Sequence, residues 1–152
     1  MAILKIRTIG DPVLRTKAKK VDKISDNTKK LIENMAETMY DAPGVGLAAP
    51  QVGILQQIVV ADADDGNGLI ALINPEIVSA SDEKAIMEEG CLSVPGEVGD
   101  VIRPERIKVQ YINTDGKKVE IDTGGLLARI LQHEIDHLNG VLYVDKVTEL
   151  GG

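Results

Sequence analysis

The chain has 152 residues, 43% of them hydrophobic and 27% charged, which is typical of one globular domain. Its net charge of −7 argues against direct nucleic-acid binding, because affinity for phosphate backbones needs a surplus of Lys and Arg. A single cysteine excludes an intramolecular disulfide framework, residues 1–7 lack the apolar core of a secretory signal, and no stretch approaches the roughly 20 apolar residues of a membrane span. We therefore expect one soluble domain over residues 1–152, in a reducing cytoplasm and without membrane association.

The first predicted helix covers residues 25–40. Ser25 or Asp26 can serve as its N-cap, and apolar side chains recur at helical spacing at Leu31, Ile32, Met35 and Met39. Residues 41–44 end the helix, since Pro and Gly both break a helical pattern. The glycine-rich segment 44–53 that follows is either a tight surface connection or a place where backbone can approach an extended peptide closely.

The middle of the chain is typical of β-strands. The runs 57–61 and 69–73 flank a turn signal at residues 64–68, and further strands are expected at 76–80, 85–89, 98–103, 106–113 and 117–122, the last two forming a hairpin around residues 113–116. Strands between an early and a late helix indicate an α+β fold. We expect antiparallel sheets packed around a central late helix, together with the N-terminal helix.

The late helix is predicted at residues 125–138 and carries the segment His-Glu-Ile-Asp-His. His133 and His137 are four residues apart, so both imidazoles can bind one metal ion from one helix face. Glu134 lies beside that ion without having to bind it, which suits a general base. The alternative is a helix with two partly buried, hydrogen-bonded histidines, but these are the only histidines in the chain and both fall in the motif.

A catalytic metal site usually has three protein ligands and one open position. After His137 the only carboxylates are Asp145 and Glu149, and there is no third histidine. A lone cysteine is most often a small buried hydrophobe. Beside a two-histidine motif that lacks a ligand, however, Cys91 is the better candidate, and with two imidazoles its thiolate suits Zn²⁺ on ligand grounds.

Three separate segments of this sequence resemble the signature motifs of the peptide deformylase family. They are GVGLAAPQ at 44–51, EGCLS at 89–93 and QHEIDH at 132–137, in the family's order and spacing, and the likeness extends over nearly the whole chain. The resemblance implies a single catalytic domain that removes the formyl group from the initiator methionine of new polypeptides and releases formate. A metal-bound water would attack the formyl carbon, with Glu134 as general acid/base.

The resemblance also implies roles for other residues. One divalent ion, Fe²⁺ natively with Zn²⁺, Ni²⁺ or Co²⁺ able to replace it, would be held by Cys91, His133 and His137. The Gln51 amide and the Leu92 backbone N–H would stabilise the developing oxyanion, an interpretation that a neutral amide donor supports. The substrate chain would contact Gly44, Val45, Gly46, Glu89 and Gly90, and an apolar pocket for the methionine side chain would be formed by Val45, Leu126 and Ile130.

The expected partners are N-formylmethionyl nascent polypeptides, which would place the enzyme near the ribosome. Many bacterial members of the family carry a further C-terminal helix, whereas this sequence stops at Gly152, so docking through such a tail is an open question. Two other functions are compatible with the metal motif. One is a general metallopeptidase that cleaves internal peptide bonds; the other is a structural metal site on a binding module, which leaves Glu134 and Gln51 unexplained.

Overall fold

The computed structural model describes residues 2–66 and 68–147. Three features of the sequence interpretation, Asn67 of the predicted turn, Glu149 and the C-terminal end at residues 150–152, lie outside the described residues. No helix within the described part of the chain is long and apolar enough to cross a bilayer.

Helix α1 (Asp26–Asp41) confirms the first predicted helix. Ser25 is its N-cap: the Ser25 hydroxyl accepts from the Thr28 N–H, and the Thr28 hydroxyl accepts from the Ser25 N–H. This reciprocal pair satisfies backbone donors that have no partner within the helix. A short 3-10 helix at Pro12–Arg15 precedes α1 and was not predicted.

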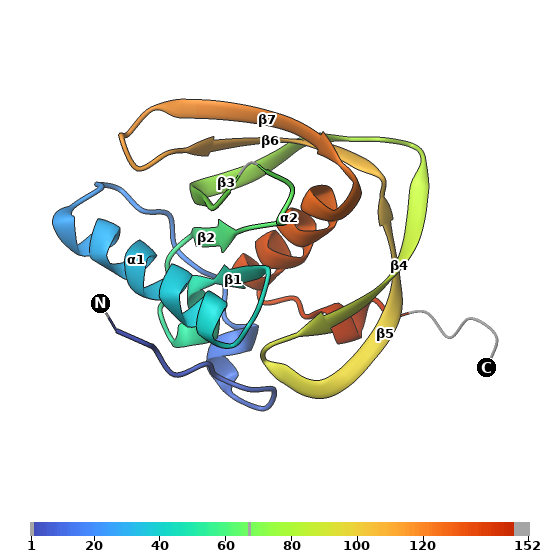
Figure 1. The fold of residues 1–152 in the computed structure, drawn as a ribbon, viewed down its shortest axis with the longest axis horizontal. Helices are drawn as coiled ribbons and strands as arrows, with labels where there is room; N and C mark the ends of the chain where they lie inside the picture. The colour runs from blue at the N-terminus through green and yellow to red at the C-terminus, as the bar shows by residue number, and fades with distance from the viewer. Residues whose placement is uncertain (1, 67, 148–152) are drawn as a thin grey trace.

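Within residues 2–66 and 68–147, seven antiparallel strands form two sheets (Figure 1). The five-stranded sheet has the order β1-β2-β3-β6-β7, with β1 at one edge. The other sheet is the hairpin of β4 and β5. The strands are β1 (Gly46–Ala48), β2 (Ile58–Ala61), β3 (Ile70–Ala80), β4 (Lys84–Cys91), β5 (Val94–Pro104), β6 (Arg106–Ile112) and β7 (Lys118–Gly124).

The strand predictions need three corrections. The separate runs 69–73 and 76–80 are one strand, β3, in which Asn74 has a φ of 53° and the register shifts between Ile73 and Glu76. The glycine-rich segment contains β1, because pairing with β2 imposes strand geometry on residues that show no alternation. Finally, β5 begins at Val94 rather than at residue 98.

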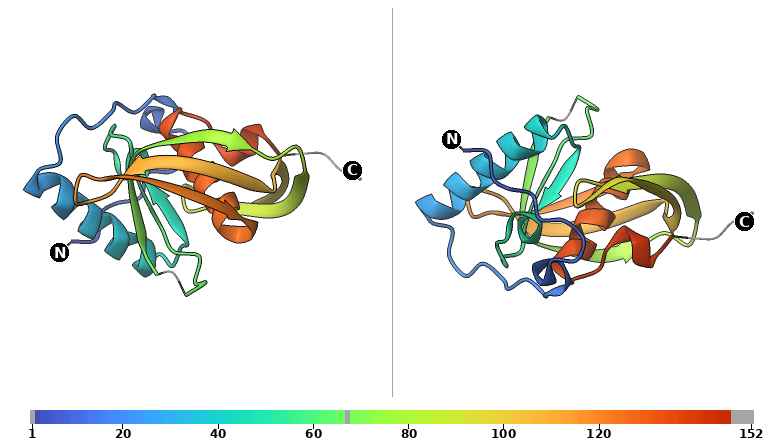
Figure 2. Two further views of the ribbon diagram at one scale, coloured as in Figure 1. Left: turned by 90° about the horizontal axis from the view of Figure 1, so that it is seen from above. Right: turned by 90° about the horizontal axis from the view of Figure 1, so that it is seen from below.

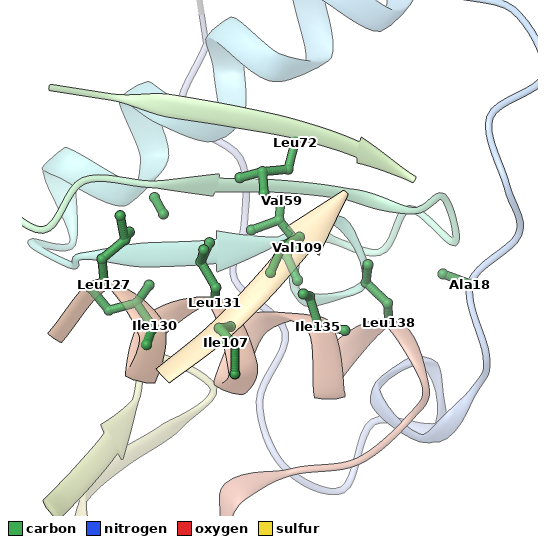
Figure 3. Close-up of a cluster of buried hydrophobic side chains, with 13 residues drawn as sticks. Ala18, Val59, Leu72, Ile107, Val109, Leu127, Ile130, Leu131, Ile135 and Leu138 are labelled. Atoms are coloured by element: carbon green, nitrogen blue, oxygen red, sulfur yellow. The ribbon is translucent and has the colours of Figure 1, made fainter. Parts of the chain in front are cut away.

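Helix α2 (Gly125–Leu138) has the predicted bounds, and Gly140 just beyond it has a φ of 76°, the left-handed conformation expected there. The helix packs on the five-stranded sheet through one apolar cluster (Figure 3) that includes Val59, Leu72, Val109, Ile130, Leu131 and Ile135. Alternate residues of β2 face the other way: Ile58 and Val60 pack in the cluster that contains Ile32, Met35 and Met39 of α1. Strands β1–β3 therefore separate α1 from α2 (Figure 2), and α2 is buried between this sheet and the β4–β5 hairpin (Figure 1).

Candidate metal centre and active site

Three predicted ligand side chains meet where α2 passes the end of β4. His133 and His137 lie one turn apart on α2, with ring centroids 5.0 Å apart, and both are buried. Cys91 is the last residue of β4, and its Sγ lies 3.4 Å from His137 Nε2. One donor atom from each of the three residues lies within 4.8 Å of the other two, so one ion can contact all three.

The chemistry of this cluster fits a borderline divalent metal. A thiolate and two imidazoles form the kind of sulfur and nitrogen donor set that Zn²⁺ and similar first-row ions accept. Two buried polar atoms at the cluster, His137 Nδ1 and Glu134 Oε1, have no hydrogen-bond partner within the described residues. Buried polar atoms are nearly always paired, so Glu134 Oε1 is available to a water molecule or a substrate.

The charges around the cluster favour a cation there. Burial lowers the pKa of His133, but Glu134, Cys91 and Glu89 outweigh burial and raise it to about 10. Burial, with the charges of His133 and Arg103, lowers the pKa of His137 to about 3, so this imidazole is neutral and able to ligate. Without a metal ion, the raised pKa keeps a proton, and so a positive charge, on His133. A bound divalent ion would supply this positive charge in place of the proton.

Glu134 has the titration behaviour of a general acid/base. Its carboxyl is fully buried, and this burial raises its pKa to about 7 against the lowering effect of the His133 charge. A group with a pKa near neutrality can both accept and return a proton during turnover. The Cβ of any residue at position 46 would lie 2.6 Å from Glu134 Oε2, so a glycine is required on the strand that faces this carboxylate.

Glu89, which we expect to contact substrate, lines a cavity together with Glu134. Its buried carboxylate accepts from His133 Nδ1 at 2.9 Å, from Arg103 at 2.6 and 3.0 Å and from Arg129 at 2.8 Å. Burial alone would raise the pKa of Glu89, but these hydrogen bonds hold it well below its usual range. A carboxylate that fixes the far nitrogen of a metal-binding imidazole orients the ring and raises its basicity. Glu89 is therefore placed to orient His133.

Gln51 contacts the cluster from the 3-10 helix Ala49–Val52. Its Oε1 accepts from the Ala48 N–H at 2.9 Å, and its Nε2 donates to Ser93 Oγ at 3.1 Å and to Cys91 Sγ at 3.5 Å. These three bonds fix which end of the amide points toward the cluster, because only the nitrogen end can donate. The amide donor therefore faces the thiol that the metal site uses.

Two cavities open onto these groups. The larger, of about 300 Å³, is lined by nine of the predicted site residues: Gly44, Val45, Gly46, Gln51, Gly90, Cys91, Leu92, His133 and Glu134. The smaller, of about 130 Å³, shares Val45 with it and extends between Leu126 and Ile130 of α2 and Met87 of β4. The third member of the cluster, His137, lines neither of these two cavities.

The sequence interpretation missed Met87 and Arg129, which line the smaller cavity. Met87 could have been found from strand alternation, because it lies two residues before Glu89 and so on the same face of β4. Arg129 donates to the Val101 and Ala85 carbonyls as well as to Glu89. Nothing in the local sequence signals those contacts, because they connect α2 with both strands of the hairpin.

Comparisons with known proteins agree with one another. The family model described as polypeptide deformylase matches residues 3–151. The chain is 59% identical to the peptide deformylase of Halothermothrix orenii, with 99% of this chain and 97% of the relative covered, and 56% identical to that of Alkaliphilus metalliredigens, with 97% and 98% covered.

Solved structures show the same relationship. The peptide deformylase from Thermotoga maritima superposes with a TM-score of 0.93 at 53% identity, covering 96% of this chain and 98% of that one. The peptide deformylase from Synechococcus elongatus, solved in complex with actinonin, has a TM-score of 0.93 at 46% identity, covering 97% and 80%.

Proposed function

The chain belongs to the polypeptide deformylase family, and on this premise we propose that Cys91, His133 and His137 hold the metal ion with which it works. It is a metal-dependent hydrolase that removes the N-formyl group from nascent polypeptides. The observation that carries the assignment of residues is their convergence: one thiol and two imidazoles lie within 4.8 Å of one another below a cavity that Glu134 and Gln51 line.

A divalent ion in this site would act as a Lewis acid toward the formyl carbonyl and lower the pKa of a water molecule. We propose Fe²⁺ as the native ion, from the family resemblance, with Zn²⁺, Ni²⁺ or Co²⁺ able to replace it. The donor set supports any of these ions.

Glu134 moves the protons of the reaction. Its carboxylate takes a proton from the attacking water while the oxygen bonds to the formyl carbon, and it then gives that proton to the methionine nitrogen as the C–N bond breaks. The products are formate and a free amino terminus. A pKa near neutrality and the unpaired Oε1 support both transfers.

The formyl oxygen gains negative charge as the tetrahedral intermediate forms. Gln51 and Leu92 both line the larger cavity, and the Gln51 amide and the Leu92 backbone N–H would donate to this oxygen. Gln51 now donates to Cys91 Sγ at 3.5 Å, a long contact that the amide can exchange for the developing oxyanion.

The substrate chain would bind along β1. This strand is at the edge of its sheet, so one side of its backbone has no strand partner, and Gly46 presents no side chain that would keep a peptide away. An extended peptide can pair with Val45 and Gly46 on one side and reach Gly90 on the other, because all three line the larger cavity. The methionine side chain would then enter the smaller cavity between Val45, Met87, Leu126 and Ile130.

The site combines residues of α2, of β1 and its loop, and of the β4–β5 hairpin, which supports one catalytic domain. Because the substrate is the amino terminus of a new chain, we place the reaction in the cytoplasm close to the ribosome. A reducing compartment also keeps the Cys91 thiol available as a ligand.

Kinetics on three matched peptides test this function. Formyl-Met-Ala-Ser should be hydrolysed efficiently, acetyl-Met-Ala-Ser should be a far poorer substrate, and an unblocked oligopeptide should remain intact. The physical reason is space: the formyl carbon carries only hydrogen, and the Gln51 amide, Leu92 and Glu134 surround the position where a methyl group would lie. Similar kcat/KM for the formyl and acetyl peptides, or cleavage inside the oligopeptide, would favour a general peptidase instead.

A further inference from the structure

The N-terminal residues 7–9 hydrogen-bond to both loops that carry the proposed oxyanion donors. The Arg7 N–H donates to the Gln51 carbonyl at 2.6 Å, and the Ile9 N–H donates to the Ser93 carbonyl at 2.8 Å. Gln51 Nε2 donates in turn to Ser93 Oγ at 3.1 Å. These three hydrogen bonds close a ring through three segments that are far apart in the sequence.

The ring has little freedom to change shape. Gln51 and Ser93 are 1% and 0% exposed, so water cannot replace their partners without opening the core. The two donors are two residues apart in one segment, and each is fixed to a different loop. Together they hold the Gln51 and Ser93 carbonyls at a set separation.

Both carbonyls belong to functional loops. Gln51 lies in the 3-10 helix Ala49–Val52, which carries the proposed amide donor. Ser93 follows Leu92 in the turn between β4 and β5, and Leu92 supplies the proposed N–H donor. When the Gln51 and Ser93 carbonyls are held in place, the distance between the Gln51 amide and the Leu92 N–H is also held.

We propose that residues 7–9 are a positioning element, the N-terminal strap, which aligns the Gln51 amide with the Leu92 N–H. This inference rests on the proposed function, in which these two groups bind the oxyanion. Pre-aligned donors stabilise charge without reorganising during the reaction, and displacing a reacting group by about 1 Å can cost about 10²-fold in rate. The strap acts through its backbone, since its bonds to Gln51 and Ser93 come from main-chain N–H groups, while the Arg7 and Ile9 side chains are 43% and 48% exposed.

The test compares proline with alanine at the same positions. Arg7→Pro and Ile9→Pro each remove one N–H donor and should lower kcat by about tenfold or more, with KM and metal content close to those of the unmodified chain. Arg7→Ala and Ile9→Ala keep the donor and should stay within about twofold. Thr8→Pro is the matched control for a proline in this segment, because within the described residues the Thr8 N–H has no acceptor.

A second background shows whether the strap acts through Gln51. In a Gln51→Leu chain the amide donor is already absent, so adding Arg7→Pro, which acts on the Gln51 carbonyl, should lower kcat by no more than about twofold further. Adding Ile9→Pro should still lower kcat, because the Leu92 donor beside Ser93 remains. Ser93→Ala opens the ring at another point without a proline. Ser93→Ala should lower kcat in the unmodified chain but cause little further loss of kcat in the Gln51→Leu chain. This comparison tests the strap even if the proline variants do not fold, as shown by the loss of their thermal unfolding transition.

The outcomes separate this inference from the proposed function. If Gln51→Leu itself leaves kcat within a few-fold, the proposed oxyanion role fails. If Gln51→Leu lowers kcat but the proline variants match their alanine controls, the strap alone is overturned. The strap is also overturned if Arg7→Pro or Ser93→Ala lowers kcat equally in both backgrounds, because its effect would then not act through the Gln51 amide.

Discussion

The active site has two walls, and they are held in different ways. The helix wall consists of His133, Glu134 and His137, which one helix places on adjacent turns. The loop wall consists of Gln51, Cys91 and Leu92, which come from segments 40 residues apart in the sequence. The helix's own backbone hydrogen bonds fix the first wall, whereas the second depends on contacts with distant residues such as Ser93, Arg7 and Ile9.

The difference suggests a division of labour. The proposed metal ligands span both walls, so an ion would join them through Cys91 on one side and the two histidines on the other. In the proposed mechanism, proton transfer belongs to the helix wall and oxyanion binding to the loop wall. Substitutions in one wall should therefore affect a different step from substitutions in the other, and the following predictions test this.

Removing the carboxylate of the helix wall should have the largest effect on turnover. Glu134→Ala should lower kcat by about 10²–10⁴, the usual loss when a general acid/base is removed, while metal content stays unchanged because Glu134 is not a ligand. Elemental analysis and kinetics on the same preparation measure both. An inactive chain that has also lost its metal would mean that Glu134 binds the ion or supports the fold.

Removing the amide of the loop wall should have the next largest effect. Gln51→Leu should lower kcat by about 10²–10³, typical of the loss of one oxyanion donor, again with full metal content. Gln56→Leu, an exposed residue nearby, is the matched control. Activity within a few-fold of the unmodified chain would show that Gln51 only shapes its loop.

Weakening the support of His133 should reduce metal affinity more than turnover of the loaded enzyme. Glu89→Gln removes the charge that orients this imidazole and pairs with Arg103 and Arg129, and changes of this kind typically cost about 10–100-fold in metal affinity. Metal dissociation constants from competition with a chelator measure the effect, with the exposed Glu83→Gln as control. Unchanged affinity would contradict the orienting role.

The smallest effect concerns pH. Glu134 must be deprotonated to accept a proton, and burial raises its pKa to about 7, while a nearby divalent cation acts in the lowering direction. The kcat/KM value should therefore be level above pH 7 and should fall with an acidic limb at or below pH 7, by up to about tenfold per pH unit. A limb centred above pH 8 would contradict this assignment.

The two walls also differ in what could be predicted from the sequence. Helix α2 has the predicted bounds because the spacing of His133 and His137 and the apolar face on Leu127 and Leu131 are local properties of a 3.6-residue period. Cys91 followed from the need for a third ligand beside the two histidines, whereas only the likeness to a known family assigned Gln51 to the site, since no periodicity links it to α2.

What the sequence could not show are contacts between distant segments. The glycine-rich segment becomes strand β1 only because β2 pairs with it, and Asn74 bends β3 while bonding to the Val21 backbone. The likeness to the family placed Glu89 at the substrate site, but no local pattern shows that Arg103 and Arg129 reach its carboxylate from β5 and α2. These outcomes depend on tertiary packing, which residue patterns do not encode locally.

Metal titration with formate release as the readout tests the central claim most directly. The chain is first treated with a chelator, and Co²⁺ is then added in steps while hydrolysis of formyl-Met-Ala-Ser is followed. We predict no activity without metal, a linear rise that ends at one equivalent per chain, and no tightly bound equivalent in Cys91→Ser or His137→Ala. Turnover by the metal-free chain, or full activity and metal binding in either variant, would contradict a single ion held by Cys91, His133 and His137.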